Sequence, residues 1–134
     1  MANRREFLKA SLITTAAVAV SGRALASAKV NFPKGLIYTK EKPGRWSAKA
    51  KLHVPMVKVD GGKITITTPH PMTRAHYIVK HTLVSMDGKT LGETTFKSTD
   101  KLARSVFQLP AEHGEYYATS FCNLHDFWVT VFTV

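Results

Sequence analysis

The residues of this sequence best suited to chemistry are its histidines and its single cysteine. The chain has 134 residues, of which six are histidine and one is cysteine. Four of the histidines and the cysteine fall in three short segments: His53, the pair His70 and His76, and the pair Cys122 and His125. Four imidazole nitrogens and one sulfur can meet at one point if the fold brings these segments together.

Such a set of side chains is typical of a redox-active metal site. Thiolate is a soft, strongly donating ligand, and four imidazoles with one sulfur suit iron or copper and exceed the four ligands of structural zinc. Five ligands of an octahedron leave one position open. An open position opposite a thiolate can bind a small oxidant, as in haem-thiolate enzymes, so we expect redox chemistry on a small molecule.

Strands are expected to position these residues, because apolar and polar residues alternate over short runs and no window keeps an apolar face at helical spacing. Asp60-Gly61-Gly62 and Asp87-Gly88 predict hairpin turns between neighbouring strands. Seven strands are predicted: His53 to Val59, Lys63 to Thr68, His76 to Met86, Leu91 to Phe96, Ser105 to Leu109, Tyr116 to Phe121 and Phe127 to Val134.

Seven short strands with regularly spaced turns predict an all-β fold, an immunoglobulin-like seven-stranded antiparallel β-sandwich. A small barrel is the alternative. Strand ends converge at the rims of a sandwich, so ligands from three segments can meet there without placing polar groups in the core.

The N-terminal segment indicates export. Arg4 and Arg5 precede an apolar stretch from Leu12 to Val20 and the small-residue site Ala24-Leu25-Ala26, which is the pattern of a twin-arginine signal. The alternatives are an amphipathic helix or a membrane anchor, but the stretch is shorter than the roughly 20 apolar residues of a spanning helix. We therefore predict a signal peptide at 1–26, an extended arm at 27–50, a metal-binding sandwich at 51–134, and a periplasmic protein without a stable membrane span.

Charge and cysteine usage fit this compartment. The net charge is +10, and loss of residues 1–26 removes four basic residues and one acidic residue, which leaves +7. A basic surface can attract a small anion or an acidic partner, and export argues against nucleic acid. A lone thiol in an oxidising compartment has no intramolecular disulfide partner, and metal ligation would protect it.

Several short motifs resemble one known family. HVP at 53–55, PHPMTRAHYI at 69–78 and SFCNLHDFW at 120–128 resemble the superoxide reductases, that is, the neelaredoxins and desulfoferrodoxins, and PGRW at 43–46 fits as well. The likeness runs from about Pro43 to the C-terminus. The order of HPM, HYI and CNLH makes it specific.

The resemblance implies a ligand set and a reaction. It makes His53, His70, His76 and His125 the equatorial ligands of one iron ion, cycling between Fe2+ and Fe3+, and Cys122 the axial ligand. It implies one-electron reduction of superoxide to hydrogen peroxide without release of dioxygen. An external donor must then reduce the iron again. The resemblance implies a rubredoxin-like donor, whereas periplasmic export leaves a cytochrome equally open as the donor. Assembly into a homo-oligomer stays open as well.

The sequence departs from the family just before His53, where the family usually has Glu then Lys and this chain has Lys51 then Leu52. Lys51 shares the strand parity of His53, so we expect its ammonium either to face the metal and attract superoxide or to be a solvated strand residue. Lys49 is the weaker substitute. Asp126 replaces a usual glycine, and aspartate tolerates a positive φ better than most residues.

Two other functions remain open. A blue-copper electron carrier is also an exported β-sandwich with cysteine and histidine ligands, but no methionine follows His125 closely. A non-catalytic module with a degenerate metal site is the third reading. The missing glutamate and lysine favour it, and retention of all five ligands speaks against it.

Overall fold

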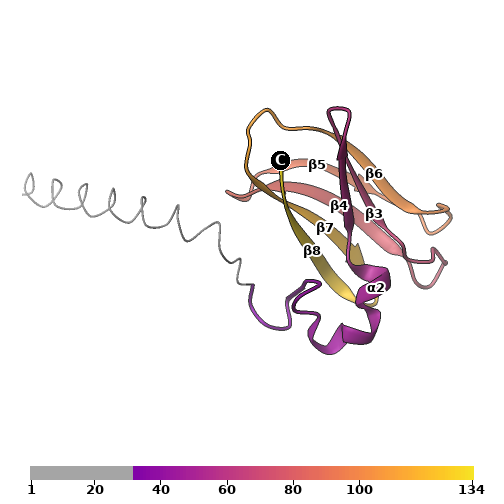
Figure 1. Ribbon diagram of the computed structural model, residues 1–134. Helices are drawn as coiled ribbons and strands as arrows, with labels where there is room; N and C mark the ends of the chain where they lie inside the picture. Colours follow the sequence, from indigo (N-terminus) through magenta and orange to yellow (C-terminus); the bar gives the residue numbers. More distant parts are fainter. Residues whose placement is uncertain (1–31) are drawn as a thin grey trace, which may run out of the picture. The chain divides into compact units, whose positions relative to one another are not determined.

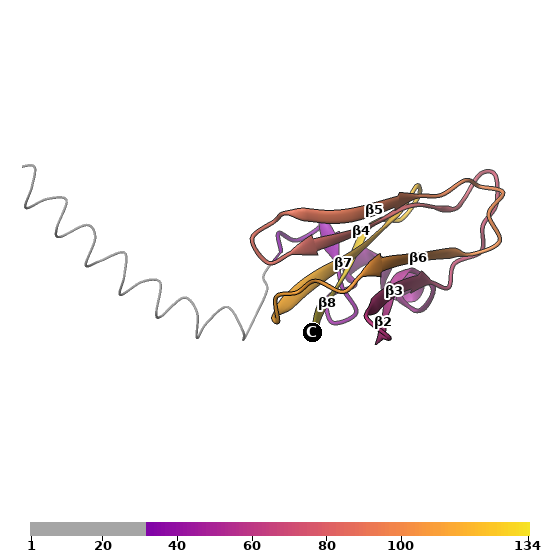
Figure 2. The same cartoon turned by 90° about the horizontal axis from the view of Figure 1, so that it is seen from above.

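The computed structural model describes residues 32–134, which fold as two β-sheets packed face to face. The predicted signal peptide lies outside the described residues. The larger sheet has the strand order β1-β8-β7-β4-β5, and the smaller has the order β2-β3-β6 (Figures 1 and 2). The predicted sandwich is therefore confirmed. Within the described residues, no helix has the length and apolar character needed to cross a bilayer.

Eight strands are present in this part of the chain, one more than the sequence predicts. They are β1 (Ile37–Tyr38), β2 (Met56–Asp60), β3 (Lys63–Thr68), β4 (Ile78–Ser85), β5 (Thr90–Thr95), β6 (Ala103–Gln108), β7 (Glu115–Cys122) and β8 (Asp126–Thr133). The additional strand, β1, has two residues and pairs in parallel with β8. Two residues are too few for an alternation to be visible in the sequence.

The two predicted hairpins are present. Asp60 pairs with Lys63, so Gly61 and Gly62 alone make the turn between β2 and β3. Both have positive φ, as a two-residue turn of this kind requires. The hairpin of β4 and β5 turns through Asp87 and Gly88, and its register shifts between Leu83 and Val84.

The segment before β2 is helical, and here the sequence prediction is wrong. A 3-10 helix, η1 (Gly44–Lys49), leads into a one-turn α-helix, α2 (Ala50–His53), so His53 ends a helix instead of opening a strand. The arm is therefore not simply extended. Alanine, lysine and leucine favour helix, and Pro55 keeps Val54 extended with ψ of 121°, which ends α2 before β2 begins.

The core lies between the sheets in two clusters of buried side chains. The first contains Ile64 and Ile66 from β3, Leu83 from β4, and Tyr116 and Ala118 from β7. The second contains Ile78, Phe96, Ala103 and Cys122. Trp128 is fully buried. The second cluster places the cysteine at the end of the sandwich where the histidines gather.

Candidate metal centre

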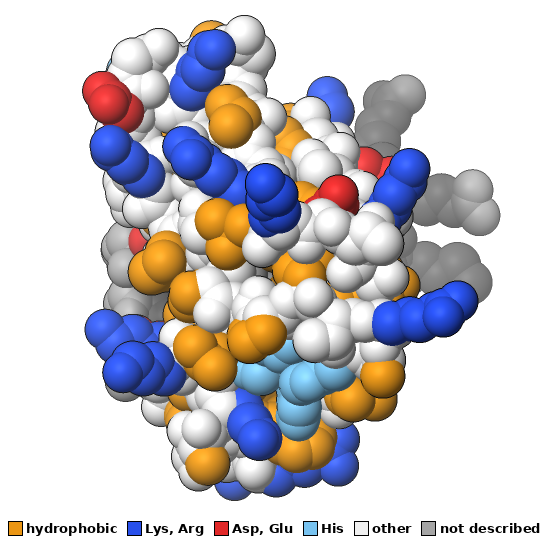
Figure 3. Space-filling model, turned by 90° about the vertical axis from the view of Figure 1, so that its right-hand side faces the viewer, with side chains coloured by type: hydrophobic (Ala, Val, Ile, Leu, Met, Phe, Trp, Pro, Cys, Tyr) orange, Lys and Arg blue, Asp and Glu red, His pale blue; other side chains and the backbone are white. Residues whose placement is uncertain are grey.

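The structure brings together all five residues singled out in the sequence. One potential ligand atom from each of His53, His70, His76, Cys122 and His125 lies within 4.8 Å of every other. They lie at or just beyond the ends of elements: His53 ends α2, Cys122 ends β7, His125 lies in the turn before β8, and His70 and His76 lie in the connection between β3 and β4. The imidazoles form a patch on the surface, with cationic side chains around it (Figure 3).

The four imidazole rings are arranged as a near-square. Going round it, the ring centroids are 4.5 Å apart for His53 and His70, 4.3 Å for His70 and His76, 4.7 Å for His76 and His125, and 4.7 Å for His125 and His53. The diagonal from His53 to His76 is longer, at 6.0 Å. Four rings around a square are the arrangement of equatorial ligands about one central ion.

The nitrogen atoms converge as ligands do. Nε2 of His76 lies 3.0 Å from Nε2 of His70 and 2.9 Å from Nδ1 of His125. Nitrogens bound at right angles to one ion with bonds of about 2.1 Å stand about 3.0 Å apart. The observed spacings therefore fit a shared metal ion.

His53 is oriented by the helix that carries it. Its Nδ1 lies 2.8 Å from the carbonyl oxygen of Lys49, one turn earlier. A carbonyl only accepts, so Nδ1 carries the proton and Nε2 keeps its lone pair. Nε2 is buried without a hydrogen-bond partner. A buried lone pair fixed by a hydrogen bond at the other ring nitrogen is the usual geometry of a metal-ligating histidine.

All four imidazoles are held neutral. Burial lowers the pKa of His53 to about 4, with smaller contributions from the other histidines. Burial is also the largest cause of the lowered pKa of His70, His76 and His125. The charge of Lys49 lowers the pKa of these same three residues further. Neutral imidazoles bind a metal without first releasing a proton.

Cys122 completes the group of potential ligands. Its side chain is fully buried, and its Sγ is 3.7 Å from Nδ1 of His125. Burial raises the pKa of the thiol in the metal-free protein. A metal ion would supply the positive charge that ionises it, since coordination deprotonates a thiol.

Asn123, which the sequence analysis did not single out, ties two ligand-bearing loops together. Its Oδ1 accepts a hydrogen bond of 3.0 Å from the backbone N–H of Tyr77, and its Nδ2 donates one of 3.0 Å to the carbonyl of Ala75. The loop that holds His76 is thus fastened to the turn between Cys122 and His125. In the sequence, this role of Asn123 is indicated by its position directly after Cys122.

The two lysines near His53 lie on helices and not on a strand. Lys51 and His53 lie on a helix, where residues two apart point in nearly opposite directions, so the argument from strand parity is wrong. Lys49 acts electrostatically on three of the histidines. Both lysines are exposed. Within residues 32–134, no carboxylate joins the ligand group.

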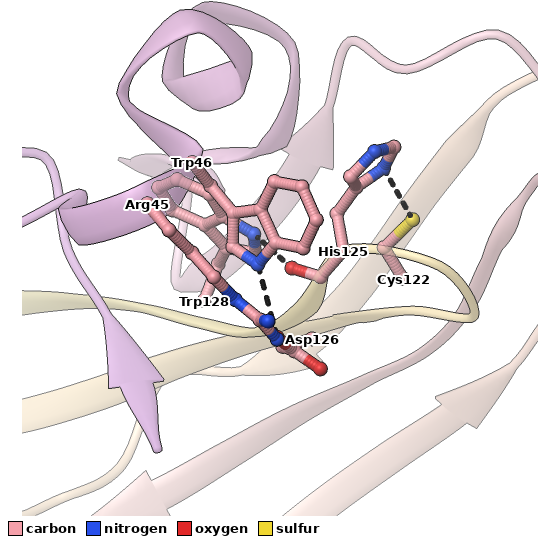
Figure 4. A network of polar contacts seen from close by, with 6 residues as sticks. All are labelled: Arg45, Trp46, Cys122, His125, Asp126 and Trp128. Carbon is pink, nitrogen blue, oxygen red and sulfur yellow. Dashed lines mark hydrogen bonds and ion pairs between the residues drawn. The ribbon is translucent and has the colours of Figure 1, made fainter. Parts of the chain in front are cut away.

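Asp126 follows His125 and begins β8. Its φ is 64°, and it is the only residue other than glycine with positive φ in the described part of the chain. The expectation that aspartate sustains this turn is confirmed. Its carboxylate contacts Arg45 and Trp46 on η1, and Trp128 donates a hydrogen bond of 2.9 Å to the carbonyl of His125 (Figure 4).

Comparison with known proteins agrees with this geometry. The sequence model of the desulfoferrodoxin family matches residues 45–131, about two-thirds of the chain. No curated protein matches the chain significantly.

Three solved structures illustrate the likeness in fold. The neelaredoxin-type superoxide reductase from Ignicoccus hospitalis matches with a TM-score of 0.59 and 25% identity over 78% of this chain and 98% of that one. A variant of the neelaredoxin from Archaeoglobus fulgidus, in its reduced form, has a TM-score of 0.56 and 25% identity over 65% and 91%. The one-iron superoxide reductase from Giardia intestinalis has a TM-score of 0.57 and 23% identity over 63% and 99%.

Proposed function

Because this chain belongs to the desulfoferrodoxin family, we propose that it is a superoxide reductase with one iron ion bound by four histidines and one cysteine. His53, His70, His76, His125 and Cys122 would hold the ion. The observation that carries the proposal is the near-square of four imidazoles whose ligand atoms lie within 4.8 Å of one another and of a buried thiol.

The donor set argues for this chemistry over electron carriage by copper. A blue-copper site uses two histidines and one cysteine in a trigonal arrangement with a weak axial ligand. Here four imidazole rings are placed around one centre, and the diagonal from His53 to His76 is longer than each of the four sides. Five protein ligands leave one octahedral position for a small substrate.

The reaction would consume one electron and two protons for each superoxide, O2•⁻ + e⁻ + 2H⁺ → H2O2. Iron, when bound, would supply the electron by passing from Fe2+ to Fe3+. Lys49 would favour approach of the anion, because its charge acts on three of the four imidazoles. Desolvated, neutral imidazoles and the thiolate would hold the ion.

The electron must then be restored from outside. Cys122 is the only cysteine, and within residues 32–134 the five-residue cluster is the only group of its kind that could hold a metal. We therefore propose an external donor. We also propose periplasmic export through residues 1–26, which cell fractionation of the full chain would test.

The test is a titration of the iron-loaded, pre-reduced protein with superoxide under exclusion of dioxygen, counting peroxide and dioxygen formed. We expect one peroxide per superoxide, no dioxygen, and a thiolate-to-iron charge-transfer band in the oxidised product. Zinc-loaded protein is the control, because zinc has no accessible second oxidation state. Dioxygen formed alongside peroxide, or the absence of oxidation, would refute the proposal.

A further inference from the structure

A polar network beside the metal centre connects the first and last ligand-bearing segments of the fold. The carboxylate of Asp126 accepts a hydrogen bond of 2.7 Å from Nη2 of Arg45 and one of 2.9 Å from Nε1 of Trp46 (Figure 4). Asp126 follows a ligand on the β7–β8 turn, whereas Arg45 and Trp46 belong to η1. That helix leads directly into α2 and its ligand His53.

The network also contacts an imidazole of the centre directly. The indole of Trp46 stands edge-on to the ring of His125, with centroids 4.6 Å apart and an interplanar angle of 88°. The guanidinium of Arg45 lies over the same indole, 4.6 Å from its centroid. Asp126 and Arg45 therefore both hold Trp46 in place, and its indole packs against the ring of His125.

Stability alone does not account for this arrangement. The side chains of Arg45 and Asp126 are 64% and 40% exposed, and ion pairs at such exposure contribute little to the free energy of folding. Asp126 also adopts a positive φ, which is unfavourable for a residue with a Cβ atom. The carboxylate is thus maintained at a position where glycine would satisfy the backbone more easily.

Asp126 stands close to two of the ligands. It directly follows His125 in the chain and pairs with Cys122 across the ladder between β7 and β8. Its carboxylate therefore places a negative charge beside the ligand group. Arg45 balances this negative charge on the outer side.

We propose that Asp126 is a positioning residue that latches η1 to the turn between β7 and β8 and, together with Arg45, sets the charge felt by the metal through His125. The inference rests on the proposed iron centre and deepens it. Through its hydrogen bond to Trp46, Asp126 holds the indole against His125 and so fixes the orientation of that imidazole. It also keeps the helix that carries His53 over the other ligands.

The first part of the test separates positioning from folding. Asp126→Gly removes the carboxylate and suits the positive φ, whereas Asp126→Asn keeps an acceptor for Trp46 and also tolerates this φ. We expect Asp126→Gly to weaken iron(II) affinity by about 10- to 100-fold in anaerobic chelator competition, and Asp126→Asn to restore it to within about threefold. Thermal unfolding of the metal-free variants should be nearly unchanged.

The second part measures the reduction potential of the iron-loaded protein at low ionic strength. Asp126→Asn leaves Arg45 unbalanced, so the potential should rise, whereas Arg45→Gln leaves the carboxylate unbalanced, so it should fall. The double variant should return toward the starting value. A purely structural latch would shift both single variants in the same direction.

The latch would be refuted by an unchanged iron affinity in Asp126→Gly, or by potentials that move together in the two single variants. Neither measurement requires turnover of superoxide. A failure of the unsubstituted protein to reduce superoxide would therefore count against the proposed function without affecting the result for the latch.

Discussion

Nδ1 of His53 lies 2.8 Å from the carbonyl oxygen of Lys49. The same helical turn therefore positions both the imidazole of His53 and the side chain of Lys49. The carbonyl fixes the lone pair of His53 toward the other imidazoles. The side chain of the same lysine supplies a positive charge that lowers the pKa of His70, His76 and His125 in addition to the larger effect of burial. Ligand orientation and anion attraction thus depend on the same short helix.

Lys49 and Lys51 form a matched pair for testing this charge. Both are exposed and lie two residues apart, but only Lys49 acts on the histidines. We expect Lys49→Met to weaken azide binding to the oxidised iron protein by about three- to tenfold at low salt, as loss of one partly screened charge predicts. Lys51→Met should change the affinity for azide less than twofold, which is about the error of the titration.

The visible spectrum during an azide titration provides the measurement, and 0.5 M salt provides a check, because screening should reduce the difference between the variants. A larger effect of Lys51→Met would return the electrostatic role to that residue. An unchanged spectrum in the unsubstituted protein would instead indicate that the sixth position is already occupied.

The strands could be predicted because their signal is local. Lys63–Thr68 has the predicted bounds, since Ile64 and Ile66 alternate with threonines and a Gly-Gly turn fixes the register with β2. The ligand-bearing segments were visible for a similar reason. Histidine and cysteine are the residue types that bind transition metals, and they stand at the ends of regular elements.

The helical segment and the latch could not be predicted in the same way. A run of four residues such as Ala50–His53 is too short for periodicity to separate helix from strand, and its helical form depends on packing beside the other ligands. Arg45 and Asp126 meet across 81 positions of sequence. No local sequence pattern around either residue predicts its contact with the other.

Gly92 in β5 offers a test of the packing that closes the sandwich. A Cβ atom at this position would lie 2.6 Å from Cδ1 and 2.9 Å from Cε1 of Phe107 on β6. We expect Gly92→Ala to lower the free energy of unfolding by about 1–3 kcal/mol, as overpacking does. Urea denaturation measures this change.

The double variant Gly92→Ala with Phe107→Leu is the control for that clash. Removal of the ring should recover part of the loss, so the two changes should not be additive. Additive effects would show that the strand, and not the contact with Phe107, is sensitive to the substitution.

His81 lies at the centre of a hydrogen-bond network buried between the sheets. Its Nε2 is 2.8 Å from Oγ1 of Thr68, and its Nδ1 is 2.8 Å from Oγ of Ser105. Thr68 in turn contacts Oγ of Ser120 at 2.8 Å. The four side chains come from β3, β4, β6 and β7, so the network joins both sheets.

This burial makes stability depend on pH with a definite sign. Desolvation lowers the pKa of His81 from 6.5 to about 4 in the folded protein. Between these values the unfolded chain takes up a proton that the folded protein does not, so stability is lost as the pH falls from about 6.5 to about 4. His81 should account for roughly 2–3 kcal/mol of that loss.

Replacement of His81 by glutamine isolates this contribution, because glutamine retains hydrogen-bonding groups but does not titrate. We expect His81→Gln to be less stable than the unsubstituted metal-free protein at pH 7, with a shallower fall toward pH 4. His113, exposed in the connection between β6 and β7, provides the matched control, and His113→Gln should keep the original slope. Urea denaturation at half-unit steps of pH gives both curves. Parallel curves for His81→Gln and the unsubstituted protein would mean that His81 is protonated in the fold and that its hydroxyl partners, not desolvation, determine its state.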